Sequence, residues 1–151
     1  MPQVILLPGL ACDARLWQSQ LGVVPPALSP AVSDAHMRHD RIDDMAAAVL
    51  REHAGPLVLV GASMGGMVAM EAARQAPERV VGLALLGTNA QPESPETYAL
   101  RESAIELFAA GELREVLEPN LAFAFHKSRI DDAALVQRYM AMMVDAGASQ
   151  L

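Results

Sequence analysis

The chain has 151 residues, of which 52% are hydrophobic and 19% are charged. This length is enough for one packed core, and the composition is typical of a globular protein rather than a disordered one. The 11 basic and 18 acidic residues give a net charge of −7. Binding to nucleic acid or to an anionic membrane needs clustered lysine and arginine, so we expect neither partner.

Cys12 is the single cysteine, which excludes an intramolecular disulfide and is typical of a reducing compartment. The first residues, Met1–Pro8, lack the basic segment of a signal peptide, and their apolar run is too short for one. No stretch approaches the roughly 18 apolar residues of a membrane-spanning helix. The sequence therefore predicts a soluble protein of the cytoplasm.

Short apolar runs alternate with helical patterns along residues 1–90. We expect strands over residues 4–7, 31–35, 57–60 and 80–86, and helices over 13–21, over 42–54 and from the Gly61–Gly66 turn to Ala76. The strand at 31–35 depends mainly on its position between Pro30 and a polar loop. Such alternation is typical of parallel strands with helices on both faces, so we predict a doubly wound α/β sheet of about four strands.

After Thr88 no further apolar strand run follows, and the sequence favours helices. Ser94 and Pro95 are typical of a helix start, because they supply an N-cap and a proline at the first helical position. We expect helices over 94–110, 112–118 and 131–147, the first closed by Gly111 and the second ended by Pro119. We therefore divide the chain into a core, 1–90, and a helical segment, 91–151.

The pattern Gly61-x-Ser63-x-Gly65 lies between an apolar run and a helical segment. A serine at such a turn can project its hydroxyl beyond the sheet, and the glycines allow strand and helix to pass closely. The helix start supplies unpaired N–H groups that suit a developing oxyanion. The pattern predicts a nucleophilic serine, and the alternative is a serine that only caps the helix.

Three stretches of the sequence resemble the α/β-hydrolase family. Leu7–Leu10 resembles the family's oxyanion loop, Gly61–Gly66 its nucleophile elbow, and Ala76–Leu86 the segment that leads into the next strand. The resemblance covers residues 4–89 and is closest to small carboxylesterases and to hydrolases of acyl or carbon–carbon bonds. It implies that the helices after Pro92 occupy the position of the family's cap, which shapes substrate choice.

The resemblance also implies roles for individual residues. Ser63 corresponds to the nucleophile, and the backbone N–H groups of Leu10 and Met64 correspond to the oxyanion hole. The family places an acid and a histidine after the serine, at the ends of later strands, whereas His126 is the only histidine after Ser63 here. We expect that the chain is truncated after its cap, that His126 completes a compact site, or that another subunit supplies the missing groups. The alternative for His126 is a surface histidine.

Metal and cofactor sites find little support in the sequence. His36 and His39 have the spacing of a ligand pair, but a zinc site needs three or four convergent ligands. A phosphate site at Gly65 and Gly66 would need the lysine of a P-loop, which the sequence lacks there. We therefore expect no metal and no cofactor.

Two functions remain open from the sequence. The first is a serine hydrolase that acts on small acyl esters or related carbonyl compounds through an acyl-enzyme. The second is a non-catalytic binding or assembly module on the same scaffold, because a hydroxyl without a base is a poor nucleophile. If residues 80–86 form a sheet edge, their unpaired N–H and C=O groups favour self-association about a two-fold axis.

Overall fold

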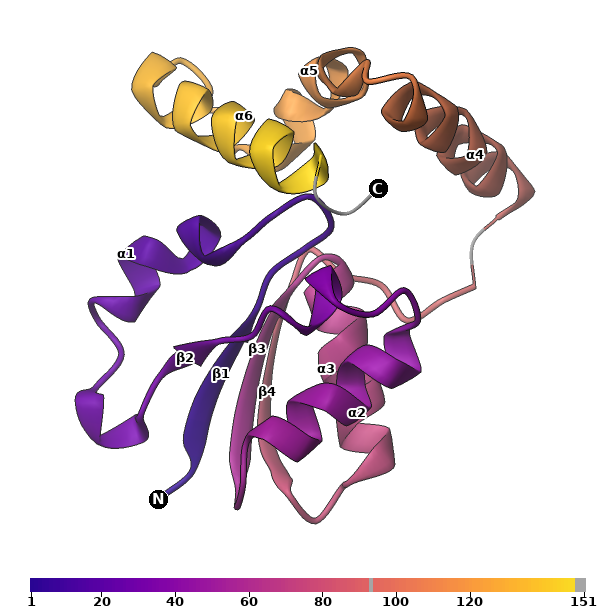
Figure 1. Ribbon diagram of the computed structural model, residues 1–151. Helices are drawn as coiled ribbons and strands as arrows, with labels where there is room; N and C mark the ends of the chain where they lie inside the picture. The colour runs from indigo at the N-terminus through magenta and orange to yellow at the C-terminus, as the bar shows by residue number, and fades with distance from the viewer. Residues whose placement is uncertain (93, 149–151) are drawn as a thin grey trace. The chain divides into compact units, whose positions relative to one another are not determined.

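The computed structural model describes residues 1–92 and 94–148, and the chain divides into two compact units, Met1–Ala90 and Gln91–Leu151. In the described part of the first unit, four parallel strands form one sheet in the order β2-β1-β3-β4 (Figure 1). The strands are β1 (Gln3–Leu7), β2 (Ala31–Val32), β3 (Leu57–Ala62) and β4 (Val80–Leu86). The predicted α/β sheet is confirmed.

Helices cover both faces of this sheet (Figure 1). Successive side chains of β1 point to opposite faces, so Ile5 joins one core cluster and Leu6 joins the other. The cluster around Ile5 packs against α2 (Ile42–Glu52) and α3 (Met64–Gln75). The cluster around Leu6 includes Trp17 and packs against the 3-10 helices η1 (Ala14–Trp17) and η2 (Pro26–Leu28) and the short helix α1 (Gln18–Leu21).

The predicted strand at 31–35 was too long, because β2 ends at Val32. The Ser33 amide still donates to the Leu6 carbonyl of β1 (3.0 Å), but the Ser33 hydroxyl accepts from the Ala35 amide (3.2 Å). A hydroxyl that bonds its own backbone in this way favours a turn. The chain therefore leaves the sheet and forms the 3-10 helix η3 (Ala35–Met37).

Arg79 fastens the sheet at the end where the strands begin. Its guanidinium donates to the carbonyl oxygens of Leu50 (2.8 Å), His53 and Gly55 (3.2 Å). These carbonyls belong to the end of α2 and the turn after it, where a helix leaves acceptors without intrahelical donors. One side chain thus satisfies acceptors that would otherwise depend on water.

The second unit contains α4 (Pro95–Ala109), α5 (Leu113–Ala124) and α6 (Ala133–Ala148) among its described residues. The Thr97 amide donates to the Ser94 hydroxyl (3.2 Å), which confirms the predicted N-cap, and Gly111 follows α4 with φ at +80°. Within residues 1–92 and 94–148, no helix is long and apolar enough to cross a bilayer.

The predicted helix end at Glu118 was wrong, because α5 continues through Pro119. A proline inside a helix removes one backbone hydrogen bond and crowds the preceding turn. In that turn the side-chain amide of Asn120 donates to the Val116 carbonyl at 2.6 Å. The asparagine thus adds a donor next to the disrupted part of the ladder.

β4 is the outermost strand on its side of the sheet formed by the described residues. Leu83 and Leu85 lie on one face of the strand and are each 43% exposed. Val81, at a register irregularity between Val80 and Gly82, is 58% exposed. Parallel strands are normally covered on both faces, so this apolar surface is unusual for the architecture.

Candidate active site

Ser63 lies at the sharp turn between β3 and α3, where the sequence predicts a nucleophile. Its φ of +52° is rare for a residue with a side chain and costs about 1 to 3 kcal/mol. The turn is fixed by two backbone bonds, from the Ser63 amide to the Leu86 carbonyl and from the Gly66 amide to the Ser63 carbonyl, both 2.9 Å. Within the described residues, the exposed Ser63 side chain makes no capping bond to α3.

Two glycines allow this turn to form, because their neighbours are backbone atoms. A Cβ on Gly61 would lie 2.3 Å from the Gly65 carbonyl oxygen. A Cβ on Gly65 would lie 2.1 Å from the Leu7 carbonyl oxygen. These distances are far below van der Waals contact, so β1, β3 and α3 can approach this closely only with glycine at both positions.

The loop after β1 passes directly beside Ser63. A Cβ on Gly9 would lie 3.3 Å from the Ser63 Cβ and 3.9 Å from its hydroxyl oxygen. The loop then makes a tight turn, in which the Cys12 amide donates to the Gly9 carbonyl (3.2 Å) and Ala11 has φ at +56°. Leu10, the proposed donor, occupies this turn and is 48% exposed.

Met64 supplies the second proposed donor, and it is the first residue of α3. The first N–H groups of a helix have no intrahelical acceptor and lie at the positive end of the helix dipole. Leu10 and Met64 thus come from two segments that meet around Ser63, as Gly9 and Ser63 already show by their contact. Both amides belong to segments that could face an anionic oxygen bound at Ser63.

Thr88, which the sequence analysis did not single out, forms a further wall beside this turn. A Cβ on Gly66 would lie 2.6 Å from the Thr88 side chain, so the second residue after β4 packs against the first turn of α3. The Thr88 hydroxyl oxygen is buried and has no hydrogen-bond partner within the described residues. Only the tertiary contact identifies this residue, since threonine after a strand is common.

His126, the candidate base, lies in the second unit between α5 and α6. Its Nδ1 is 2.8 Å from the Ser128 hydroxyl and accepts a hydrogen bond from the Ser128 amide (3.3 Å). A backbone N–H can only donate, so Nδ1 is unprotonated in this contact and the neutral ring carries its proton on Nε2. A base that accepts a proton through Nε2 requires the opposite tautomer.

His36 is hydrogen-bonded to the backbone in the structure. Its Nε2 lies 2.8 Å from the Cys12 carbonyl oxygen, and the side chain is buried. Within residues 1–92 and 94–148, no group of three or more potential ligands gathers around a common point. Burial also raises the pKa of the Cys12 thiol to about 11, with a smaller contribution from the Asp13 carboxylate, so the thiol stays protonated at neutral pH.

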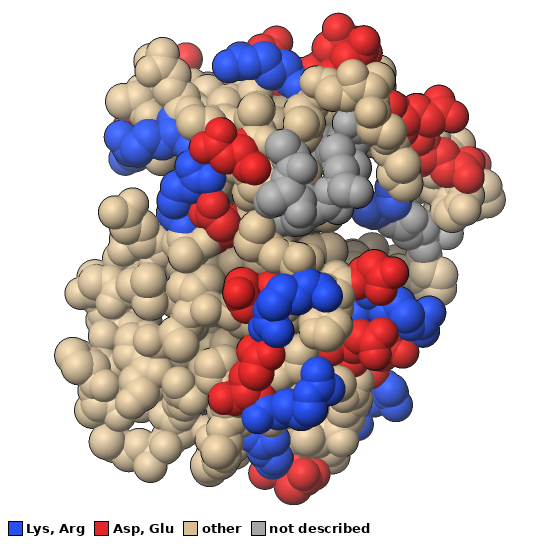
Figure 2. Space-filling view, in the orientation of Figure 1, with Lys and Arg blue, Asp and Glu red and all other residues tan. Residues whose placement is uncertain are grey.

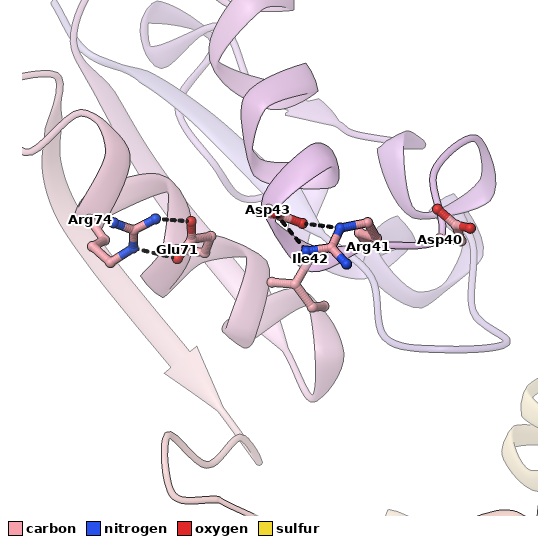
Figure 3. A pocket seen from close by; sticks show the side chains of 6 residues that line it. All are labelled: Asp40, Arg41, Ile42, Asp43, Glu71 and Arg74. Carbon is pink, nitrogen blue, oxygen red and sulfur yellow. Dashed lines mark hydrogen bonds and ion pairs between the residues drawn. The ribbon is translucent and has the colours of Figure 1, made fainter.

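A charged cleft of about 530 Å³ lies elsewhere on this unit, and Ser63 does not line it. Its walls are Asp40, Arg41, Ile42, Asp43, Glu71 and Arg74 (Figure 3). Arg41 pairs with Asp43 at 3.0 Å and Arg74 with Glu71 at 2.7 Å. Figure 2 shows the same interleaving of acidic and basic groups across this part of the surface. Because its arginines are already paired, the cleft has the character of a solvated surface.

We expect Arg74→Ala to return the Glu71 pKa from about 2 toward its usual value of 4.5, because Arg74 is the main donor to this carboxylate and Gln75 the second. A lowered pKa favours the folded state above the usual value, and this contribution is lost as the pH falls from 4.5 through about 2. Carboxyl-carbon NMR titration measures the shift. Arg51→Ala is the control, and an equal shift in that variant would contradict the assignment.

A family model described as the alpha/beta hydrolase family matches residues 4–150. A pimeloyl-[acyl-carrier protein] methyl ester esterase of Aromatoleum aromaticum is 30% identical over 121 residues, which cover 71% of this chain and 48% of the relative. A protein of the same name from Vibrio campbellii is 27% identical over 149 residues, which cover 93% and 52%. The chain therefore spans about half the length of these curated relatives.

A solved structure shares the fold. The malate-bound thermophilic esterase from Thermogutta terrifontis has a TM-score of 0.80 and 24% identity, over 99% of this chain and 61% of that chain. The family match spans nearly the whole sequence, and the parallel sheet with its glycine-flanked serine turn agrees with it. The chain belongs to the α/β-hydrolase family.

Proposed function

We propose that this chain is a serine hydrolase that acts on small acyl esters or related carbonyl compounds, with Ser63 as the nucleophile. One observation carries the proposal: the exposed Ser63 is held at φ +52° beside the Gly9 loop. A serine that served only as a helix cap would need neither the strained turn nor the neighbouring loop. The relatives named as methyl ester esterases support an ester as the substrate.

In the proposed reaction the Ser63 hydroxyl oxygen attacks the ester carbonyl carbon and loses its proton to a base. The carbonyl oxygen becomes negative and accepts hydrogen bonds from the amides of Leu10 and Met64. As this intermediate collapses, the base returns the proton to the leaving oxygen, so that the alcohol departs and an acyl group remains on Ser63. Water then loses a proton to the base and attacks the acyl carbon, which releases the carboxylic acid and returns the proton to the Ser63 oxygen.

The base that accepts the Ser63 proton is His126 or a group from another polypeptide segment. The Ser128 amide must stop donating to His126 Nδ1 before Nε2 could accept a proton from Ser63. The 2.8 Å contact with the Ser128 hydroxyl can remain, because a hydroxyl also accepts from Nδ1–H. We infer that the base comes from another polypeptide segment, because the Ser128 amide donates to His126 Nδ1. A non-catalytic module on this scaffold is the alternative that remains if Ser63 proves unreactive.

The proposal is tested by locating a covalent label. The chain is incubated with a fluorophosphonate, digested and sequenced by tandem mass spectrometry. We expect the phosphonyl group on Ser63, because attack on phosphorus uses the same hydroxyl and the same oxyanion donors as attack on an ester. A label on another residue would contradict the proposal, as would an unmodified chain after complete labelling of a reference serine esterase.

We expect Leu10→Pro to slow both phosphonylation and ester hydrolysis by about 10²- to 10³-fold, the cost of one oxyanion donor. Leu10 is the second residue of the turn closed by the Cys12 amide and the Gly9 carbonyl, a position that proline favours. The change therefore removes the N–H while keeping the turn. Leu10→Ala keeps the amide and is the control. Equal rates in the two variants would remove Leu10 from the oxyanion hole.

We also propose that a second copy of this chain covers the exposed face and edge of β4. Two β4 strands can pair antiparallel about a two-fold axis, which satisfies their outer N–H and C=O groups and brings side chains of the second copy beside Leu83 and Leu85. Light scattering is expected to give twice the mass of one chain, and Leu85→Lys is expected to give a monomer. Val23→Lys, at an exposed valine outside the sheet, should stay dimeric. A monomeric parent chain at tens of micromolar would contradict the proposal.

A further inference from the structure

His36 is a buried titratable side chain that the proposed reaction does not use. It is 8% exposed, and its Nε2 lies 2.8 Å from the Cys12 carbonyl oxygen. A carbonyl can only accept, so Nε2 carries a proton and donates it. This bond joins η3 to the loop that contains Leu10, although 24 residues separate the two partners in the sequence.

The position of His36 is itself fixed by the sheet. The Ser33 amide bonds to the Leu6 carbonyl of β1 (3.0 Å), and the Ser33 hydroxyl accepts from the Ala35 amide (3.2 Å). Ala35, the residue before His36, is therefore linked to the buried strand β1 through Ser33 by two successive hydrogen bonds. These hydrogen bonds restrict the backbone that carries His36, so the imidazole ring keeps one position beside the Cys12 carbonyl.

The loop that His36 holds is strained. Ala11 has φ at +56°, and the turn around it is closed by the bond from the Cys12 amide to the Gly9 carbonyl (3.2 Å). A non-glycine residue keeps such a conformation only where its surroundings impose it. The Cys12 N–H donates to the Gly9 carbonyl, and the Cys12 carbonyl accepts from the His36 ring. The backbone on both sides of the Cys12 Cα is therefore hydrogen-bonded.

His36 also lies near the segment that carries the second proposed donor. A cavity of about 10 Å³, large enough for roughly one water molecule, is lined by Pro8, His36 and Gly65 among others. Pro8 begins the Leu10 loop, and Gly65 follows Met64 in the first turn of α3. The His36 ring therefore lies beside both segments that contain the proposed oxyanion donors, Leu10 and Met64.

We propose that His36 is a positioning residue, which holds the Cys12 carbonyl and thereby fixes the Leu10 amide in the direction that faces Ser63. The inference rests on the proposed function, because it concerns the geometry of the same oxyanion site. The bond uses Nε2 as a donor, and both the neutral and the protonated ring can supply it. His36 does not take the Ser63 proton, since this nitrogen is already engaged with Cys12.

The test compares two substitutions that differ in one donor. His36→Gln places a side-chain N–H near the Cys12 carbonyl, and His36→Leu fills the site without one. The first-order rate of Ser63 phosphonylation at saturating fluorophosphonate should fall about 10- to 100-fold in His36→Leu and stay within about threefold of the parent in His36→Gln. The probe concentration at half-saturation should change little, because the buried His36 ring acts through the loop and not on the probe itself.

Two controls separate positioning from general stability. Hydrogen exchange of the Cys12 amide should accelerate in His36→Leu and be restored in His36→Gln, whereas His39→Leu should match the parent in both rate and exchange. Unchanged phosphonylation in His36→Leu would overturn the inference, as would equal losses in the leucine and glutamine variants. A parent chain that is not labelled at Ser63 would instead defeat the proposed function, and the inference with it.

Discussion

Ser63→Ala is expected to reduce hydrolysis of a chromogenic short-chain ester to the background rate and to abolish fluorophosphonate labelling. In the form of the enzyme that includes the base, the loss should be about 10⁴-fold or more, since removal of the catalytic serine then leaves only binding and oxyanion stabilisation. The folded state should be unaffected, because the exposed Ser63 side chain makes no capping bond within the described residues. Ester turnover and the intact mass after labelling measure the two effects.

Ser29→Ala provides the matched control for this experiment. Ser29 is also an exposed serine with a positive φ, +43°, but it lies at the end of η2 and away from the Gly9 loop. Its replacement tests whether losing a strained serine is by itself enough to reduce activity. Parent-like turnover in Ser63→Ala would end the assignment of the nucleophile.

Gly65→Ala is expected to prevent the first unit from folding. The added Cβ would lie 2.1 Å from the Leu7 carbonyl oxygen and 2.6 Å from the Pro8 carbonyl oxygen, and both are backbone atoms that a rotamer change cannot move. Overpacking of a core usually costs about 1 to 3 kcal/mol, and an overlap with backbone should exceed that range. We expect loss of the cooperative urea transition measured by circular dichroism.

Gly22→Ala separates this clash from the general effect of removing a glycine. Gly22 has φ at −71°, and a Cβ there would meet its nearest neighbour, the Ser19 carbonyl oxygen, at 3.7 Å. Alanine fits that position and restricts the unfolded chain, so stability should be equal or up to about 1 kcal/mol higher. A Gly65→Ala protein with parent-like stability would show that β1 and α3 can separate without cost.

The parts of the fold that depend on local pattern could be predicted from the sequence. Val80–Leu86 forms a strand over the predicted residues, because seven consecutive apolar or small residues suit a parallel sheet. The start of α4 follows from Ser94 and Pro95, whose effects act within one turn. The glycine-flanked serine could be placed at a turn for the same reason.

The parts that depend on distant contacts could not be predicted. Nothing local distinguishes His36 from a loop histidine, since its partner lies 24 residues away. The positive φ of Ala11 carries no sequence signal, because alanine rarely adopts it and glycine would be expected there. Pro119 favours a helix end until the Asn120 side chain is seen to bond within the same helix.

The hydrogen bonds from Arg79 to three backbone carbonyls make one end of the first unit more rigid than the other. They secure the end of the sheet where strands begin, while Ala11 and Ser63, the strained residues of the candidate site, lie where β1 and β3 end. Thermal opening should therefore start among the reactive loops and reach the Arg79 end last.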